Sequence, residues 1–213
     1  MADHLEIEQK FDVDPDLERP DFAAVTAGVA AAEPVLHRLS ATYFDTADGR
    51  LQAAKITLRR RTGGTDAGWH LKLPAGEDAP VPGGVSARRE VHEPLEGAGT
   101  DAAGAPVVPA LLASRVAEVT GGLALAPIAI LVTERTVVTL TSDDGTLLAE
   151  IADDQVTASR LPETSAEPLR WREIEVEVPT ADPQLQQAVA DRLLAAGARP
   201  AGHGSKLGRL LSA

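Results

Sequence analysis

The sequence of 213 residues contains no cysteine. Disulfides, thiolate metal sites and a cysteine nucleophile are therefore excluded, which suits a cytoplasmic protein. No apolar run reaches the roughly 18 residues that are needed to cross a bilayer. The N-terminus also lacks the basic stretch and apolar core of a secretory signal. We therefore expect a cytoplasmic protein that has no membrane partner.

Positive charge is scarce as well, because the formal net charge is −12 at pH 7. That balance argues against a general nucleic-acid binder, including a DNA-binding protein, which relies on a basic surface. Among the cations, arginine outnumbers lysine by sixteen to four. A position that keeps lysine in such a chain suggests a need for a compact ammonium rather than a planar guanidinium. The four lysines are Lys10, Lys55, Lys72 and Lys206.

Polar–apolar alternation and β-branched residues predict a chain that is mainly β, of the α+β class. The predicted strands are residues 4–11, 36–45, 55–62, 68–73, 86–93, 128–140, 146–158 and 169–178. The predicted helices are residues 20–31, 107–120 and 182–196, and the predicted long loops are residues 74–85 and 94–106. Glycine-rich turns at 63–66 and 143–145 predict hairpins. We expect one domain over residues 1–213, with a core at about 4–210, built as an antiparallel barrel or a strongly curved sheet.

Several predicted strands carry charged side chains on one face only. Glu6, Glu8 and Lys10 share a face because side chains alternate along a strand. The same parity groups residues on other strands: Glu173 with Glu175 and Glu177, Glu150 with Asp154, Arg59 with Arg61, His70 with Lys72, and Arg88 with Glu90. These faces form either a solvated outer surface or the lumen of a barrel whose apolar exterior is covered by helices. A closed barrel of about eight strands can hold a small ligand.

A charged lumen of this composition would bind a metal and a polyphosphate together. Mg²⁺ and Mn²⁺ take oxygen ligands, and the candidate ligands are Glu6, Glu8, Glu173 and Glu175, with Glu150, Asp154 and Glu177 assisting. Arginine and lysine suit a linear polyphosphate, and the candidates are Lys10, Arg59, Arg61, Lys72, Arg88 and Arg135. Opposed charges are rarely packed together for stability alone, because buried ion pairs often fail to recover their desolvation cost.

An ordered set of short motifs resembles the CYTH domain of the triphosphate tunnel metalloenzyme superfamily. The run Glu6-Ile7-Glu8-Gln9-Lys10 resembles the ExExK motif of that family. The further resemblances, in chain order, are Tyr43-Phe44-Asp45-Thr46, Leu58-Arg59-Arg60-Arg61, Trp69-His70-Leu71-Lys72, Arg88-Arg89-Glu90, Arg135, Glu150 through Asp154, Glu173-Ile174-Glu175-Val176-Glu177 and Ser205-Lys206-Leu207-Gly208-Arg209. Together they extend over about residues 4–210.

The resemblance implies an eight-stranded antiparallel β-barrel that forms a charged tunnel, with helices packed on its outside. It also implies divalent-metal-dependent action on triphosphates, with Lys206 added to the phosphate-binding set. Glu6, Glu8, Lys10 and Lys72 would be the catalytic residues, with Mg²⁺ or Mn²⁺ as cofactor. The C-terminal motif resembles the junction at which bacterial inorganic triphosphatases pass into a CHAD domain. A CHAD domain in the same or another chain is therefore an expected partner, and the chain is expected to be a monomer or a homodimer.

The expected function is hydrolysis of inorganic triphosphate, or a related short polyphosphate, by metal-activated water attack on a terminal phosphoryl group. The alternatives are a thiamine-triphosphatase, a nucleoside triphosphatase or adenylate cyclase, and a non-catalytic polyphosphate-binding module. Two orientations are also predicted. Arg88 rather than Arg89 should face the tunnel, because Arg88 shares the parity of Glu90. Trp69 and Trp171 should both pack beneath the outer helices.

Overall fold

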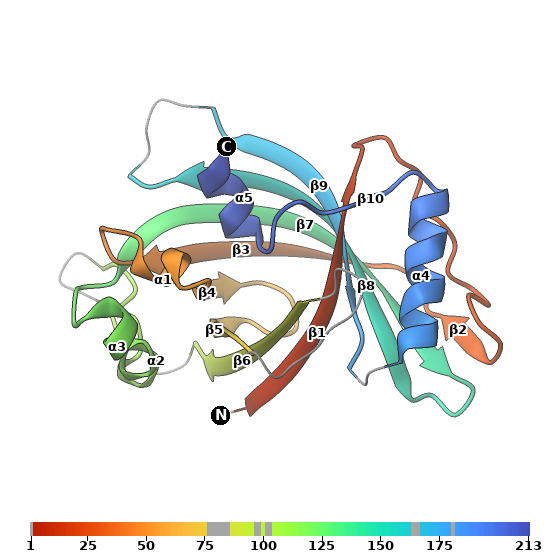
Figure 1. Ribbon diagram of the computed structural model, residues 1–213, viewed down its shortest axis with the longest axis horizontal. Helices are drawn as coiled ribbons and strands as arrows, with labels where there is room; N and C mark the ends of the chain where they lie inside the picture. Colours follow the sequence, from red (N-terminus) through yellow and green to blue (C-terminus); the bar gives the residue numbers. More distant parts are fainter. Residues whose placement is uncertain (1, 76–85, 96–98, 101–103, 163–166, 180–181) are drawn as a thin grey trace.

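Eight antiparallel strands close into a barrel in the computed structural model, which describes residues 2–75, 86–95, 99–100, 104–162, 167–179 and 182–213 (Figure 1). Neighbouring strands follow the order β1-β6-β5-β4-β3-β7-β8-β9, and β9 pairs back on β1. The barrel strands are β1 (Ala2–Val13), β3 (Val35–Asp45), β4 (Thr57–Thr62), β5 (Gly68–Pro74), β6 (Ser86–Pro94), β7 (Ala126–Ser142), β8 (Leu147–Arg160) and β9 (Leu169–Glu177). The predicted strands and fold class are confirmed.

Helices cover the outside of the barrel, where the apolar side chains of the strands point. Phe11, Ile151 and Ile174 are fully buried in one cluster beneath α4 (Pro183–Ala195), together with Val189 of that helix. A second cluster joins β4, β5 and β6 to α1 (Arg50–Ala53), α2 (Ala110–Arg115) and α3 (Ala117–Thr120). Since the apolar faces pack outward, the opposite, charged faces of the same strands line the interior.

The helix predicted near residue 182 begins and ends where its sequence indicates. Asp182 is its N-cap, and its carboxylate accepts hydrogen bonds from the backbone N–H of Gln184 at 3.1 Å and Leu185 at 3.0 Å. Such a cap satisfies donors that have no partner within the helix. After the C-cap residue Ala196, Gly197 adopts a φ of 106°.

The other two predicted helices differ from the structure. Residues 20–31 form turns and then the short strand β2 (Val29–Ala31), which pairs with β7. Ala24 and Gly28 there have φ values of 50° and 74°, which a right-handed helix does not allow. The helix predicted over 107–120 is divided between α2 and α3, and Pro109 is the N-cap of α2. The loop predicted at 74–85 lies largely outside the described residues, as do residues 96–98 and 101–103 of the loop predicted at 94–106.

The C-terminal helix α5 (Lys206–Ser212) was not predicted, nor was the two-residue strand β10 (Arg199–Pro200) that pairs with β1. Leu207 and Leu210 of α5 pack against Leu131 of β7 and Trp171 of β9. These barrel residues share the inward parity of the charged lining, so α5 fills one end of the barrel interior (Figure 1). The expectation that Trp171 lies beneath the outer helices is therefore wrong, whereas Trp69 does pack there, against Phe44 at a ring-centroid distance of 5.0 Å. Within the described residues, no helix is long and apolar enough to cross a membrane.

Candidate functional site

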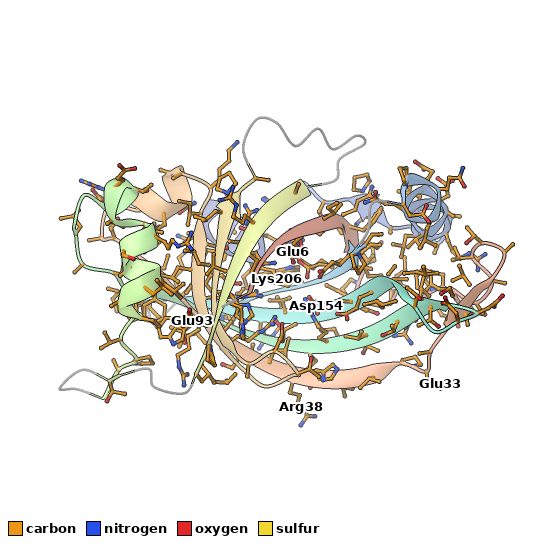
Figure 2. All side chains as sticks on the ribbon, turned by 90° about the horizontal axis from the view of Figure 1, so that it is seen from below. Glu6, Glu33, Arg38, Glu93, Asp154 and Lys206 are labelled. Carbon is orange, nitrogen blue, oxygen red and sulfur yellow. The ribbon has the colours of Figure 1, made fainter. Side chains whose placement is uncertain are left out.

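The barrel encloses a cavity of about 300 Å³, here called the barrel cavity. Every site residue that the sequence predicts lines this cavity, except Asp154 and Glu173. Those two carboxylates lie behind the lining and contact the ammonium of Lys206. Figure 2 shows Glu6, Asp154 and Lys206 inside the barrel, whereas Arg38 projects outward. The charged strand faces therefore form the lumen rather than a solvated surface.

Strand register concentrates negative charge along one wall of the barrel cavity. Glu8 of β1 lies opposite Glu177 of β9, and Glu177 in turn lies opposite Glu150 of β8. Like charges that lie directly opposite each other destabilise a sheet unless cations neutralise them. The carboxylate wall, as defined here, consists of Glu6, Glu8, Glu150, Asp154, Glu173, Glu175 and Glu177.

Two lysines neutralise the part of the carboxylate wall that β1 contributes. The ammonium of Lys10 donates to Glu8 Oε2 at 2.7 Å and also to Glu175. The ammonium of Lys72 donates to Glu6 at 2.5 Å. Burial lowers the pKa of Lys10, but Glu175 and Glu8 more than offset this effect and raise it to about 12. Lys10 is therefore a fixed positive charge at neutral pH and does not accept a proton there.

Lys206 lies among three carboxylates at the N-terminus of α5. Its Nζ lies 2.8 Å from Asp154 Oδ2 and 2.7 Å from oxygens of both Glu173 and Glu175. Burial opposes its charge, but the three carboxylates together raise the pKa of Lys206 well above its ordinary value. One oxygen from each of Asp154, Glu173 and Glu175 lies within 4.8 Å of the others. That spacing suits a group that binds a single cation.

Arg135 of β7 connects two of these carboxylates, Asp154 and Glu175. Its guanidinium donates to both oxygens of Asp154, at 2.8 and 2.6 Å, and to Glu175 Oε2 at 2.7 Å. Burial raises the pKa of Glu175, but Lys10, Lys206 and Arg135 reverse this and hold it well below the ordinary range. Glu175 is thus ionised at neutral pH.

Trp171 orients one of the predicted metal ligands. Its indole Nε1–H donates to Glu173 Oε2 at 2.6 Å, and the guanidinium of Arg209 lies 5.1 Å from its ring centroid. The sequence pattern could have predicted this contact, because residues 171 and 173 share a strand face. The hydrogen bond fixes which oxygen of Glu173 is directed toward Lys206.

The charge of Glu177, in the carboxylate wall, changes with pH near neutrality. Burial, followed by the charge of Glu6, raises its pKa to about 7, with Glu150 and Glu8 adding to the effect. Lys72 acts in the opposite direction but does not compensate. At this position the negative charges of the cavity are therefore not fully neutralised by the neighbouring cations.

The opposite wall consists of Arg59 and Arg61 of β4, here called the guanidinium wall. The Nε atoms of both arginines are buried and have no hydrogen-bond partner among the described residues. Burial and the neighbouring Arg59 and Arg135 lower the pKa of Arg61 to about 9. Buried donors without acceptors are costly. An anion in the barrel cavity would supply the missing acceptors.

His70 and Glu90 also line the barrel cavity, and the sequence prediction assigned them no role. His70 Nδ1 lies 2.8 Å from Glu90 Oε1, and Nε2 lies 3.0 Å from the backbone oxygen of Asp66. Burial lowers the pKa of His70 to about 4, so the ring is neutral. The sequence pattern could have predicted that His70 lines the cavity, because His70 shares a strand face with Lys72. In agreement with prediction, Arg88 lines the cavity and Arg89 is exposed.

Asp45, within the motif of residues 43–46, stabilises the backbone and does not line the barrel cavity. Its Oδ1 accepts from the backbone N–H of Thr46 at 2.7 Å and of Leu51 at 2.8 Å, and its Oδ2 accepts from Gln52 at 3.0 Å. It therefore fixes the start of α1 outside the barrel. Tyr43 of the same motif lines the cavity, and its hydroxyl accepts from Arg59 at 3.3 Å.

Comparison with known proteins agrees with this geometry. The model of the CYTH domain family matches residues 4–204. Two uncharacterised proteins of Mycobacterium tuberculosis are 42% identical over 224 residues, which is 100% of this chain but only 41% of their own length. The chain thus spans about two fifths of these relatives.

Two solved structures share the fold. A candidate adenylate cyclase from Bacillus halodurans superposes with a TM-score of 0.62 at 19% identity, covering 98% of each chain. A candidate adenylyl cyclase from Hippeastrum, HpAC1, which has a dominant triphosphatase activity, gives a TM-score of 0.57 at 20% identity, covering 97% of this chain and 95% of HpAC1. Because the family model extends over nearly the whole barrel and its charged interior, the chain belongs to the CYTH domain family.

Proposed function

We propose that this protein is a divalent-metal-dependent triphosphatase that cleaves the terminal phosphoanhydride bond of inorganic triphosphate. One observation carries the proposal: a carboxylate wall faces two arginines whose buried Nε donors have no partner among the described residues. A cation binder does not need the guanidinium wall, and a simple anion binder does not need the carboxylates. The triphosphatase activity of HpAC1, which shares the fold, supports the assignment.

The donor set of the carboxylate wall fits a hard divalent cation. Asp154, Glu173 and Glu175 present oxygens within 4.8 Å of one another, and Mg²⁺ and Mn²⁺ prefer such oxygen ligands. We propose these three as ligands together with the predicted ligands Glu6, Glu8, Glu150 and Glu177. When bound, the metal supplies charge neutralisation for the phosphates and lowers the pKa of a bound water.

The remaining polar residues bind and orient the triphosphate. Arg59 and Arg61 line the cavity, and a guanidinium group suits bidentate contact with phosphate oxygens. Lys10 stays protonated, so it contributes charge rather than acting as a base. Phosphoryl transfer depends mainly on positioning and charge stabilisation, which such fixed cations provide. Lys72, Arg88, Arg135 and Lys206 complete the proposed phosphate-binding set.

Phosphate release from inorganic triphosphate, ATP and thiamine triphosphate tests the proposal directly. Each substrate is assayed with Mg²⁺, with Mn²⁺ and with EDTA. The proposal expects metal-dependent release with the highest kcat/KM for inorganic triphosphate. A preference for thiamine triphosphate, or formation of cyclic AMP from ATP, would replace it with one of the alternatives. Absence of hydrolysis, with an increase in Tm on adding triphosphate, would identify a binding module.

We also propose that the protein works with a CHAD domain, located in the same or another chain. The support is the resemblance of residues 205–209 to a CYTH–CHAD junction, and the relatives are more than twice as long as this chain. Light scattering of this chain, alone and mixed with a CHAD domain, distinguishes a monomer, a homodimer and a complex.

A further inference from the structure

A second cavity adjoins the barrel cavity and is here called the annex. It has a volume of about 420 Å³ and lies between the start of β4 and the segment that leads into α5. Thr57, Arg88, Gly204 and Ser205 line both cavities, so the two adjoin each other at these residues. A molecule that is too long for the barrel cavity would therefore extend past Arg88 into the annex.

The lining of the annex selects for an anion. Lys55, Arg88 and His203 contribute basic side chains, and none of the described lining residues carries a carboxylate. This is unusual in a chain with a formal net charge of −12. Nor do the described lining residues include a phenylalanine, tyrosine or tryptophan. It therefore offers no aromatic surface on which a nucleobase or a thiamine ring would stack.

The backbone holds Lys55 and Arg88 together despite their like charges. Lys55 has a φ of 58°, a left-handed conformation that is uncommon for a residue with a side chain. Its N–H donates to the backbone oxygen of Gln52 at 2.9 Å, and its own carbonyl accepts from Arg88 Nη2 at 3.3 Å. The backbone after α1 thus links Lys55, which lines the annex, to Arg88, which lines both cavities.

We infer that the annex binds the fourth phosphoryl group of inorganic tetraphosphate, and the following groups of longer linear polyphosphates. The inference rests on the proposed function, since the first three phosphoryl groups occupy the barrel cavity. The barrel cavity, at about 300 Å³, is at the small end of ligand pockets. One water cleaves the terminal P–O–P bond of tetraphosphate and yields orthophosphate and triphosphate. Lys55 is therefore a specificity-determining residue that distinguishes tetraphosphate from triphosphate.

Initial rates for triphosphate and tetraphosphate test this assignment, with products separated by ion chromatography. The measured quantity is the ratio of kcat/KM for tetraphosphate to kcat/KM for triphosphate. Lys55→Asn removes the charge while placing a residue that tolerates positive φ, and we expect it to lower the ratio about fivefold. Lys55→Arg, which keeps the charge, should restore most of the wild-type ratio.

A matched control is Arg38→Gln, which removes one positive charge from an exposed site on the outer face of β3. This control should leave the ratio at the wild-type value. An unchanged ratio in Lys55→Asn, with triphosphate still hydrolysed, would overturn the annex assignment alone. If the wild type hydrolyses neither substrate, the proposed function itself fails. A ratio that falls equally in Arg38→Gln would attribute the effect to net charge and also overturn the assignment.

Discussion

Replacing Lys206 with methionine should destabilise the metal-free protein strongly. Lys206 is only 8% exposed, and its ammonium contacts Asp154, Glu173 and Glu175 within 2.8 Å. Methionine has a similar length but no charge, so the substitution leaves three buried carboxylates with one cation fewer. Arg135 still neutralises Asp154 and Glu175, but no other ammonium or guanidinium contact to Glu173 occurs among the described residues.

The magnitude follows from the burial of this cluster. Breaking a buried ion pair from one side typically costs about 3–5 kcal/mol, because the remaining charge is desolvated and uncompensated. For a domain of this size, about 1 kcal/mol lowers Tm by about 2–4 °C. Lys206→Met should therefore lower Tm in EDTA by about 6–20 °C. Mg²⁺ should raise the Tm of this variant more than that of wild type, because the Lys206 ammonium competes for the same carboxylate oxygens.

Thermal unfolding followed by circular dichroism, with EDTA and with saturating MgCl₂, measures both effects. Arg38→Met is the control, since Arg38 pairs with Glu134 at 3.2 Å while its side chain is 80% exposed. Such a pair contributes under about 1 kcal/mol. If Lys206→Met melts within about 2 °C of wild type in EDTA, the carboxylates do not depend on Lys206 and the reasoning is refuted.

Three further predictions concern other residues of the barrel. Trp171→Phe removes the N–H that orients Glu173 but keeps an aromatic ring. The Mg²⁺ concentration for half-maximal activity should therefore rise about tenfold. An unchanged Mg²⁺ titration would contradict this role. The pKa of Glu177, raised from 4.5 to about 7, means that the folded protein holds a proton that the unfolded chain releases between those values. As pH rises from 5 to 8 in EDTA, the unfolding free energy of wild type should therefore fall by about 2 kcal/mol relative to that of Glu177→Gln. Parallel profiles of Tm against pH for the two proteins would contradict the raised pKa of Glu177. Asp45→Ala removes the acceptor of three backbone N–H groups. The unfolding free energy, measured by urea titration, should fall by about 2–4 kcal/mol. A change in KM without a loss of stability would instead indicate a role in the site.

The strands and the charged lumen were predictable because both depend on local alternation. In β1 between Leu5 and Phe11, and in β9 from Glu173 to Glu177, the charged residues share one strand face, and this face lines the cavity once the barrel closes. Parity alone, however, does not say what packs against that lining. Trp171 was predicted outside the barrel on the argument that it alternates with the lumen residues, but it shares the parity of Glu173 and lies inside.

The elements that prediction missed depend on contacts between distant parts of the chain. A seven-residue helix such as α5 is not stable on its own, and it forms because Leu207 and Leu210 pack on the inner barrel wall. The segment 20–31 is rich in alanine, but pairing of Val29–Ala31 with β7 and positive φ values at Ala24 and Gly28 prevent a helix. In the same way, the spare donors of Arg59 and Arg61 became visible only when the neighbours of both side chains were known.

The most direct test of the central claim compares wild type with Glu175→Gln in one assay of phosphate release from inorganic triphosphate, with Mg²⁺ and with EDTA. Glu175 contacts Lys10, Arg135 and Lys206 and belongs to the three-carboxylate group, so the account requires its charge for metal binding. We predict Mg²⁺-dependent release by wild type, no release in EDTA, and a loss of at least about 100-fold in kcat/KM for a folded Glu175→Gln protein. Equal release with Mg²⁺ and with EDTA, or a folded variant as active as wild type, would contradict the account.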